Sequence, residues 1–134
     1  MRDDPSEPRW LSRRAADAMH AQLIREHGGR HGVRDDGLID SALARPHNRW
    51  AHGDDDDLAA LAATLGYGLA KNHGYVDGNK RIAFMALFVF LHMNGLLLAA
   101  PEPDAVVIMT EVAAGECTER HLADWIRRHT TPIA

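Results

Sequence analysis

The feature that most constrains the fold is an uninterrupted apolar run over residues 82–91. A helix that crosses a bilayer needs about 20 apolar residues, and Asn94-Gly95 separates this shorter run from the apolar residues that follow it. A helix that is apolar on nearly every face is covered by its neighbours. The run therefore predicts a central helix, from about Lys80 to His92 or Met93, around which the rest of the chain packs.

The remaining apolar residues recur at three- and four-residue intervals, the period of an amphipathic helix, and no segment sustains a period of two. Capping residues set the expected boundaries. The predicted helices are residues 12–27 behind Ser12, a short helix that Asp36 caps and that stops before Pro46, residues 58–72, the central helix, a helix that opens at Pro103 and Asp104 and ends at Gly115, and a last helix behind Thr118. The sequence thus predicts an all-α protein, a compact bundle of about six helices.

Four consecutive acids at residues 54–57 stand just before the helix expected at Leu58. Acidic side chains at a helix N-terminus accept hydrogen bonds from free N–H groups and complement the helix dipole. We interpret the run as a cap, with a cation site as the alternative. Residues 46–57 show no clear period and are expected to form a surface loop. A loose segment of residues 1–10 and one domain over residues 11–134 account for the chain.

Composition argues against several classes of function. The formal net charge is −4, whereas a protein that coats nucleic acid needs a strongly basic face. Cys117 is the only cysteine, so the chain can form neither an internal disulfide nor a cysteine-based zinc cluster. Residues 1–10 lack the apolar stretch of a secretory signal. We therefore expect a cytoplasmic protein that makes no direct contact with nucleic acid or membrane.

The segment that carries chemistry is HGYVDGNKR, residues 73–81, between two predicted helices. A helix N-terminus presents free N–H groups and a partial positive charge, and here it begins at or near Asn79. Gly78 allows the backbone to turn sharply and to approach a ligand closely. Lys80 and Arg81 place two cations at this end, where the dipole disfavours them unless an anion is bound. The pattern is typical of a phosphate site.

Two side chains beside this helix end extend the interpretation. Asp77 is able to hold a magnesium ion, which favours one or two carboxylates together with phosphate oxygens. His73 precedes the anion site and has the chemistry of a general base that acts on a hydroxyl. A base, a metal ligand and a phosphate cradle within nine residues predict phosphoryl or nucleotidyl transfer.

Each of these residues also has an ordinary structural interpretation. A histidine after a helix is commonly a C-cap or a hydrogen-bonding group of the core. Asp77-Gly78 is a common turn pair, and Asn79 is a common helix cap. His73 and Asp77 could instead be two zinc ligands, although no third ligand follows at a suitable spacing. The residues alone leave these alternatives open.

Taken together, the segment resembles the signature of the Fic/Doc family, roughly H-x-F-x-[DE]-[GA]-N-[GK]-R. Tyr75 stands where the family usually has phenylalanine, and Gly74 where many members have proline. Nucleotidyl-transferring members usually carry glycine at the position of Lys80 and a second arginine three residues after the first. This chain has lysine there and Phe84 in place of the second arginine, which is similar to the Doc (death on curing) branch.

Two other blocks carry the same resemblance. Residues 35–46, DDGLIDSALARP, are similar to the segment before the flap of Doc-like proteins, and residues 111–129 to their C-terminal pair of helices. The Ser/Thr-x-x-x-Glu-Gly/Asn pattern of self-inhibited Fic proteins is absent from the sequence. We expect the target to dock on residues 47–53, in the position of the flap. Trp50 is either part of that surface or a core anchor beneath it.

The resemblance implies a protein serine/threonine kinase. Members of the Doc branch are toxins that use ATP to phosphorylate a threonine of elongation factor Tu and so block translation. By this resemblance His73 is the base, and Asp77 holds Mg²⁺. The residues expected to bind the nucleotide phosphates are Gly78, Asn79, Lys80 and Arg81. The lysine would turn the nucleotide so that its γ-phosphate faces the base.

The resemblance also implies a partner and leaves two alternatives. The partner is a cognate antitoxin, a small Phd-like DNA-binding repressor. The first alternative is a Fic-type nucleotidyltransferase, which transfers AMP to a target hydroxyl. The second is a catalytically inactive Fic-fold binding module. The three differ in what reaches the target: a phosphoryl group, AMP, or nothing.

Overall fold

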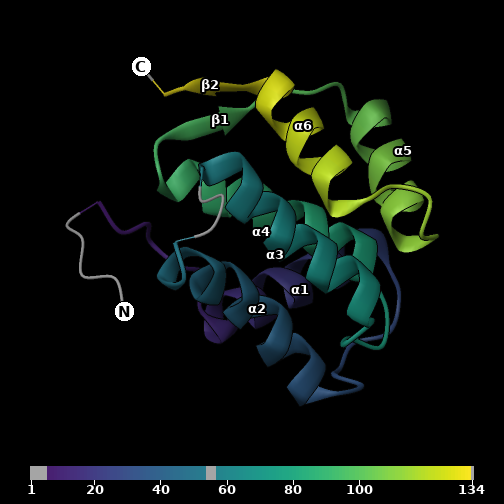
Figure 1. The fold of residues 1–134 in the computed structure, drawn as a ribbon. Coiled ribbons are helices and arrows are strands. Elements are labelled where there is room, and N and C mark those ends of the chain that lie inside the picture. The colour runs from purple at the N-terminus through teal and green to yellow at the C-terminus, as the bar shows by residue number, and fades with distance from the viewer. Residues whose placement is uncertain (1–5, 54–56, 134) are drawn as a thin grey trace.

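Six helices make up most of the part that the structure describes, residues 6–53 and 57–133 of a computed structural model (Figure 1). The helices are α1 (Arg13–His27), α2 (Asp36–Ala51), α3 (Leu58–Asn72), α4 (Asn79–Met93), α5 (Glu102–Ala113) and α6 (Glu119–His129). A short antiparallel ribbon joins β1 (Leu96–Leu98) to β2 (Thr130–Pro132). The predicted bundle of six helices is confirmed. No helix among the described residues is long and apolar enough to cross a membrane.

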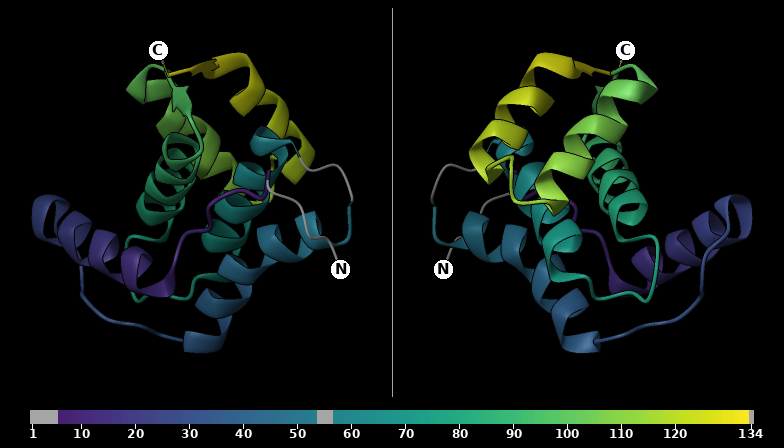
Figure 2. Two further views of the ribbon diagram at one scale, coloured as in Figure 1. Left: turned by 90° about the vertical axis from the view of Figure 1, so that its left-hand side faces the viewer. Right: turned by 90° about the vertical axis from the view of Figure 1, so that its right-hand side faces the viewer.

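Helices α3 and α4 form the middle of the bundle, with α1 and α2 against one side and α5 and α6 against the other (Figures 1 and 2). In α4, Ile82, Leu87 and Phe90 are fully buried, as the apolar run predicts. The opposite side of the helix is only partly buried, so the predicted cover by neighbours is incomplete there: Phe84, Met85, Phe88 and Val89. Helix α3 is buried still more completely, because its alanines and glycines let its neighbours approach closely. A Cβ atom on Gly66 would lie only 2.5 Å from Leu87 Cδ2. The two helices therefore share the centre.

Side-chain caps begin α1, α3 and α6 where the sequence predicts them. Ser12 accepts an N–H of α1 at 3.0 Å, and Thr118 accepts an N–H of α6 at 3.1 Å. Asp57 Oδ1 accepts from Ala60 N at 2.6 Å, which confirms the capping role of the last of the four acids. Residues 54–56 lie outside the described residues.

Helix α2 differs from its prediction at both ends. Asp35, rather than Asp36, is the cap, and its Oδ1 accepts an N–H of the first turn at 3.1 Å. The helix also continues through Pro46, so residues 47–51 are helical and the predicted loop is wrong there. Pro46 has no N–H to bond to the carbonyl four residues back. Burial of Pro46 and Trp50 against the core offsets that loss.

The β-ribbon is an element that the sequence analysis does not predict, because strands of three residues are too short to display alternation. Its register pairs Leu97 with Thr131, and Ile133 N donates to Gly95 O at 2.9 Å. The ribbon ties the chain that follows α4 to the chain that follows α6. The end of the bundle is thereby closed on the side opposite α1 and α2 (Figure 1).

The residues before α1 contact the bundle through Arg9 and Trp10. Arg9 N donates to Asn94 Oδ1 at 2.8 Å, and Asn94 Nδ2 donates to Arg9 O at 3.1 Å. The Trp10 ring stacks on Phe90, with 5.9 Å between the centroids. Residues 1–5 lie outside the described residues, so the loose segment expected over residues 1–10 stays a prediction.

Candidate active site

The loop between α3 and α4 brings the sequence-predicted site residues to one place. His73 follows the last residue of α3, and Asp77 stands two residues before α4. The carboxyl end of one helix and the amino end of the next meet at this loop. The predicted phosphate-binding residues are the N-cap of α4 and its first three residues: Gly78, Asn79, Lys80 and Arg81.

His73 ends α3 in a left-handed backbone conformation, with φ 50° and ψ 47°. Among the described residues it is the one non-glycine residue with a positive φ. This conformation costs about 1–2 kcal/mol for a residue with a Cβ atom, and glycine or asparagine is usual at such a helix end. The side chain is exposed, and no hydrogen bond to its imidazole forms within the described residues. His73 therefore ends α3 as its C-cap and still leaves its imidazole accessible.

The connection between α1 and α2 holds this loop from one side. Val33 and Tyr75 form an isolated antiparallel bridge. Gly74 O accepts from Arg34 N at 2.8 Å. A Cβ atom on Gly74 would collide with the side chain of Ile39, so the position has no room for one. The loop is therefore fixed by close backbone approach as well as by its own turn.

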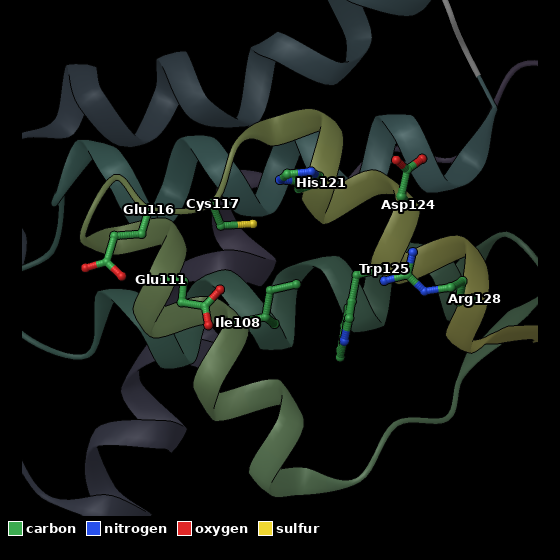
Figure 3. Close-up of a pocket in the computed structure, with 8 residues that line it drawn as sticks. All are labelled: Ile108, Glu111, Glu116, Cys117, His121, Asp124, Trp125 and Arg128. Carbon is green, nitrogen blue, oxygen red and sulfur yellow. The ribbon is translucent and has the colours of Figure 1, made fainter.

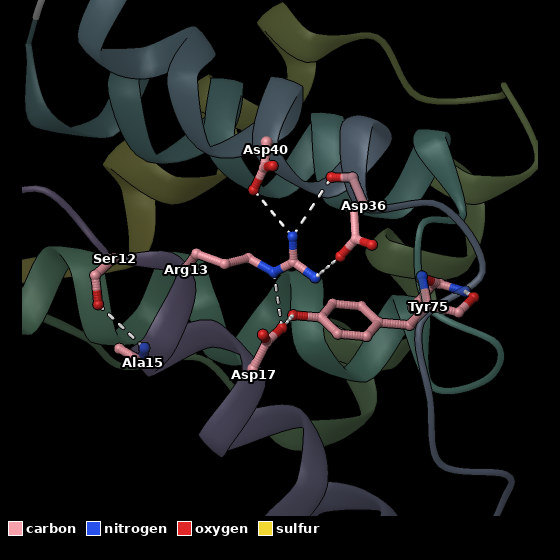
Figure 4. A network of polar contacts seen from close by, with 8 residues as sticks. Ser12, Arg13, Ala15, Asp17, Asp36, Asp40 and Tyr75 are labelled. Atoms are coloured by element: carbon pink, nitrogen blue, oxygen red, sulfur yellow. Dashed lines mark hydrogen bonds and ion pairs between the residues drawn. The ribbon is translucent and has the colours of Figure 1, made fainter.

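Tyr75 anchors the loop to α1. Its side chain is buried and stacks on His20, with 3.9 Å between the ring centroids. The hydroxyl donates to Asp17 Oδ1 at 2.7 Å, and Arg13 Nε donates to the same oxygen at 2.9 Å (Figure 4). Burial, and then the hydrogen bond to Asp17, raise the pKa of the Tyr75 phenol above its usual range. The hydroxyl therefore stays protonated and keeps its donor role at ordinary pH.

His20 is a site residue that the sequence analysis misses. It lies among the apolar positions of α1, is 3% exposed, and donates from Nε2 to Asp77 O at 2.7 Å. A trans peptide directs its C=O and N–H to opposite sides, so this bond turns the N–H of Gly78 away from His20. The available sequence signal is a histidine at a core position of a helix, which does not reveal its distant partner.

Asp77 presents a carboxylate of which one oxygen is engaged. The side chain is half-buried, and Oδ2 accepts from Arg30 N at 2.8 Å. The other oxygen has no hydrogen-bond partner among the described residues. This arrangement fits magnesium, which takes few protein ligands beside phosphate oxygens and water. Residues 6–53 and 57–133 contain no group of three or more His, Cys, Asp or Glu able to hold a metal ion, so the geometry offers no support for zinc.

The amino end of α4 is open to a ligand. The Asn79 side chain closes the loop instead, because its Nδ2 and Oδ1 bond to the O and N of Tyr75 at 3.0 Å each. No side chain caps α4. Lys80 and Arg81 are exposed, and neither has an ion-pair partner in the described part of the chain. Uncapped N–H groups beside two unpaired cations are the features expected of an anion site, and the phosphate-binding role stays a prediction.

Residues 47–53, on which we expect the target to dock, lie far from the loop between α3 and α4. The connection between α2 and α3 is at the far end of α3 from His73, about 22 Å away at the rise of an α-helix. Trp50 is 3% exposed and makes an edge contact with Trp10. It is therefore a core anchor, and residues 47–53 do not flank the motif. Of the described connections between helices before α3, the one between α1 and α2 is the one that contacts the motif.

A cavity of about 270 Å³ lies between α5 and α6 (Figure 3). Its lining includes Glu111, Cys117 and His121, and none of the motif residues. Burial, and then the charge of Glu111, raise the pKa of the Cys117 thiol. The thiol is therefore neutral at ordinary pH and poorly nucleophilic. The candidate chemistry stays at the loop between α3 and α4.

Comparison with known proteins shows the family to which the chain belongs. A sequence model of the Fic/DOC family matches residues 10–91, which include the whole loop. The chain is 48% identical over 94 residues to "Toxin Doc" of Mycolicibacterium smegmatis, covering 67% of this chain and 72% of that one. It is 31% identical over 111 residues to "Protein kinase doc" of Escherichia phage P1, covering 83% and 87% of the two chains.

Proposed function

Because the chain belongs to the Fic/Doc family, and within it to the Doc branch, we propose that it is the toxin of a toxin–antitoxin pair. The proposed activity is that of a protein serine/threonine kinase, which transfers the γ-phosphoryl group of ATP to a threonine of elongation factor Tu in the cytoplasm and so blocks translation. The amino end of α4 carries this proposal, because Lys80 and Arg81 stand unpaired in the described residues beside an uncapped helix. Triphosphate oxygens satisfy both groups of donors.

His73 is the proposed base. Its imidazole accepts the proton of the threonine hydroxyl while the hydroxyl oxygen forms a bond to the γ-phosphorus. The bond from that phosphorus to the oxygen bridging it to the β-phosphate breaks, and ADP leaves with the electron pair. The proton on His73 then passes to water. The exposure of the imidazole on the loop that leads into α4 supports this role.

The residues around the base bind and orient the nucleotide. Backbone N–H groups at Gly78 and Asn79, with the side chains of Lys80 and Arg81, hold the phosphates. Asp77 would hold magnesium, which would supply positive charge to offset that of the phosphates. Catalysis is mainly positioning and charge stabilisation.

Lys80 favours phosphoryl transfer over nucleotidyl transfer. A long cation at this position adds charge and fills space that glycine leaves open. The nucleotide then binds turned, and the γ-phosphorus rather than the α-phosphorus faces His73.

The proposed partner is a Phd-like antitoxin, a small DNA-binding repressor with a tail that folds on this protein. The name of the relative "Toxin Doc" supports a toxin in this pair. Expression of the chain alone is expected to arrest growth, and the His73→Asn change is expected to relieve the arrest. Arrest that survives this change would indicate inhibition by binding rather than by catalysis.

The decisive experiment is intact-mass spectrometry of elongation factor Tu after incubation with this protein, ATP and magnesium. His73→Asn serves as the inactive variant, because asparagine tolerates the left-handed backbone but cannot act as a base. His92→Asn, at the exposed far end of α4, is the matched control. We expect a gain of one phosphoryl mass with the wild type and with the His92 variant, and none with the His73 variant.

Each other outcome has a definite meaning. A gain of one adenylyl mass would assign the protein to nucleotidyl transfer and contradict the proposed role of Lys80. Equal gains with and without His73 would remove it as the base. No gain on elongation factor Tu would contradict the target, and no transfer to any protein in a whole extract with labelled ATP would contradict the kinase.

A further inference from the structure

We propose that Arg34 is a positioning residue, which holds the backbone of His73 in the conformation that presents its imidazole to the substrate. The proposal rests on the proposed role of His73 as the base. Three consecutive carbonyls, those of residues 72–74, carry it, because all three accept hydrogen bonds from Arg34. This residue precedes α2 and reaches the loop from a distant part of the sequence.

The contacts of Arg34 come from both its side chain and its backbone. Nε donates to His73 O at 2.7 Å, and Nη2 donates to Asn72 O at 3.1 Å. Arg34 N donates to Gly74 O at 2.8 Å. Charged donors form the stronger hydrogen bonds, and the guanidinium presents its donors in a rigid fork. One residue therefore fixes the last carbonyl of α3 and the two that follow.

The conformation of His73 needs this support. A residue with a Cβ atom is disfavoured in the left-handed region and persists there only where its surroundings over-determine it. The backbone angles of His73 set the direction of its Cβ atom and hence of the imidazole. A backbone that left this region would carry the ring to another position relative to the start of α4. The hydrogen bonds that Arg34 donates to the carbonyls of residues 72–74 hold His73 in the left-handed region.

An ordinary electrostatic cap is the competing explanation, since a cation near a helix C-terminus is favourable by charge alone. The two roles differ in their requirements. If Arg34 is only an electrostatic cap, lysine is able to replace it, and its loss affects only the stability of the protein. If Arg34 is a positioning residue, the paired donors of its guanidinium are required. Loss of Arg34 then lowers kcat while the affinity for the nucleotide is kept. The reason is that the phosphates bind at α4, to which Arg34 makes no hydrogen bond in the described residues.

The test compares Arg34→Ala and Arg34→Lys with the wild type and with Arg14→Ala. Arg14 is the matched control, an exposed arginine of α1 with no partner in the described residues. We expect kcat to fall about 10- to 100-fold in both Arg34 variants, the size expected when a catalytic group is misplaced. We expect the dissociation constant for ATP, measured by calorimetry without target, to stay unchanged. Thermal denaturation verifies that each variant is folded.

A second measurement reads the loop without any activity. The Cα and Cβ chemical shifts of His73, recorded by NMR, report its backbone conformation, and they are expected to change in Arg34→Ala and not in Arg14→Ala. Unchanged shifts, or full turnover in Arg34→Lys, would overturn the proposal. Shifts that change while the wild type transfers no phosphoryl group would contradict the proposed function and leave the support of His73 by Arg34 in place.

Discussion

Asp77 makes contacts that separate its structural role from its proposed chemical one. Its backbone carbonyl accepts from His20, and its carboxylate accepts from Arg30 N. Replacement of the side chain by asparagine keeps an oxygen for Arg30 and removes only the charge. The proposed magnesium ligand can therefore be tested without loss of the loop that carries it.

We expect Asp77→Asn and Asp77→Ala to raise the magnesium concentration needed for half-maximal transfer sharply, because a carboxylate is the preferred protein ligand of this ion. The measurement is a magnesium titration of phosphoryl transfer at saturating ATP. Asp124→Asn, a half-buried carboxylate of α6, is the control. A titration of Asp77→Asn that matches the wild type would remove Asp77 as the metal ligand.

The start of α4 has no side-chain cap, unlike the starts of α1, α3 and α6. Ser12, Asp57 and Thr118 cap α1, α3 and α6 with side-chain oxygens, whereas Gly78 leaves α4 without such a cap. Local sequence explains both cases, because Gly78 has no side-chain oxygen to accept a hydrogen bond and adopts a positive φ without strain. The open helix end is thus built by the same local rules that close the others.

Lys80→Gly is expected to weaken γ-phosphoryl transfer, because it removes one cation from this end and reopens the space beside the phosphates. Lys80→Arg, which keeps the charge and bulk, is expected to retain transfer. The mass of the modified target measures both effects and also detects any adenylyl group. Undiminished phosphoryl transfer by Lys80→Gly would contradict the turned nucleotide.

Close packing of α3 on α4 gives a test of the fold that is independent of activity. Gly66→Ala would place a methyl group against Leu87 and is expected to lower the free energy of unfolding by about 1–3 kcal/mol. Gly37→Ala, on the exposed first turn of α2, is the control. Its Cβ atom would lie 3.3 Å from the capping Oδ1 of Asp35, and the gain in helix propensity of up to about 1 kcal/mol offsets a small shift of that cap, so we expect a smaller effect than at Gly66. Urea denaturation measures both. Equal effects would contradict the close contact.

Glu119 joins three helices across the bundle. Its Oε2 accepts from Arg49 of α2 at 2.9 Å and from Thr64 of α3 at 3.0 Å. Its Oε1 accepts from Arg45 at 2.8 Å. The side chain is only 23% exposed, so these bonds are screened less than those of surface pairs. Glu119 therefore fixes the start of α6 against the rest of the core.

Glu119→Ala is expected to lower the free energy of unfolding by about 1–3 kcal/mol, because it removes three hydrogen bonds to a charged, partly buried carboxylate. Glu116→Ala, an exposed acid just before α6, is the control. Thermal denaturation followed by circular dichroism measures the difference. Phosphoryl transfer below the melting temperature is expected to persist, because the Glu119 network makes no contact with the motif loop among the described residues.

The sequence by itself determined the helices, most of their caps and the identity of the motif. Ser12 and Thr118 cap helices where the sequence predicts them, because helix formation depends on residues within about four positions of one another. The residues of the motif also lie next to each other in the chain, so their meeting at one loop required no knowledge of the fold. His73 and Asp77 are examples.

The tertiary structure alone decided which distant residues support the motif and which segments lie near it. Arg34 reaches His73 across 39 residues, and His20 reaches Asp77 across 57. Because Trp50 is buried, α2 continues as a helix beyond Pro46. The segment on which we expect the target to dock therefore lies at the far end of α3 from the motif. Local periodicity carries no information on such contacts, because their free energy comes from surfaces that meet only when the helices pack.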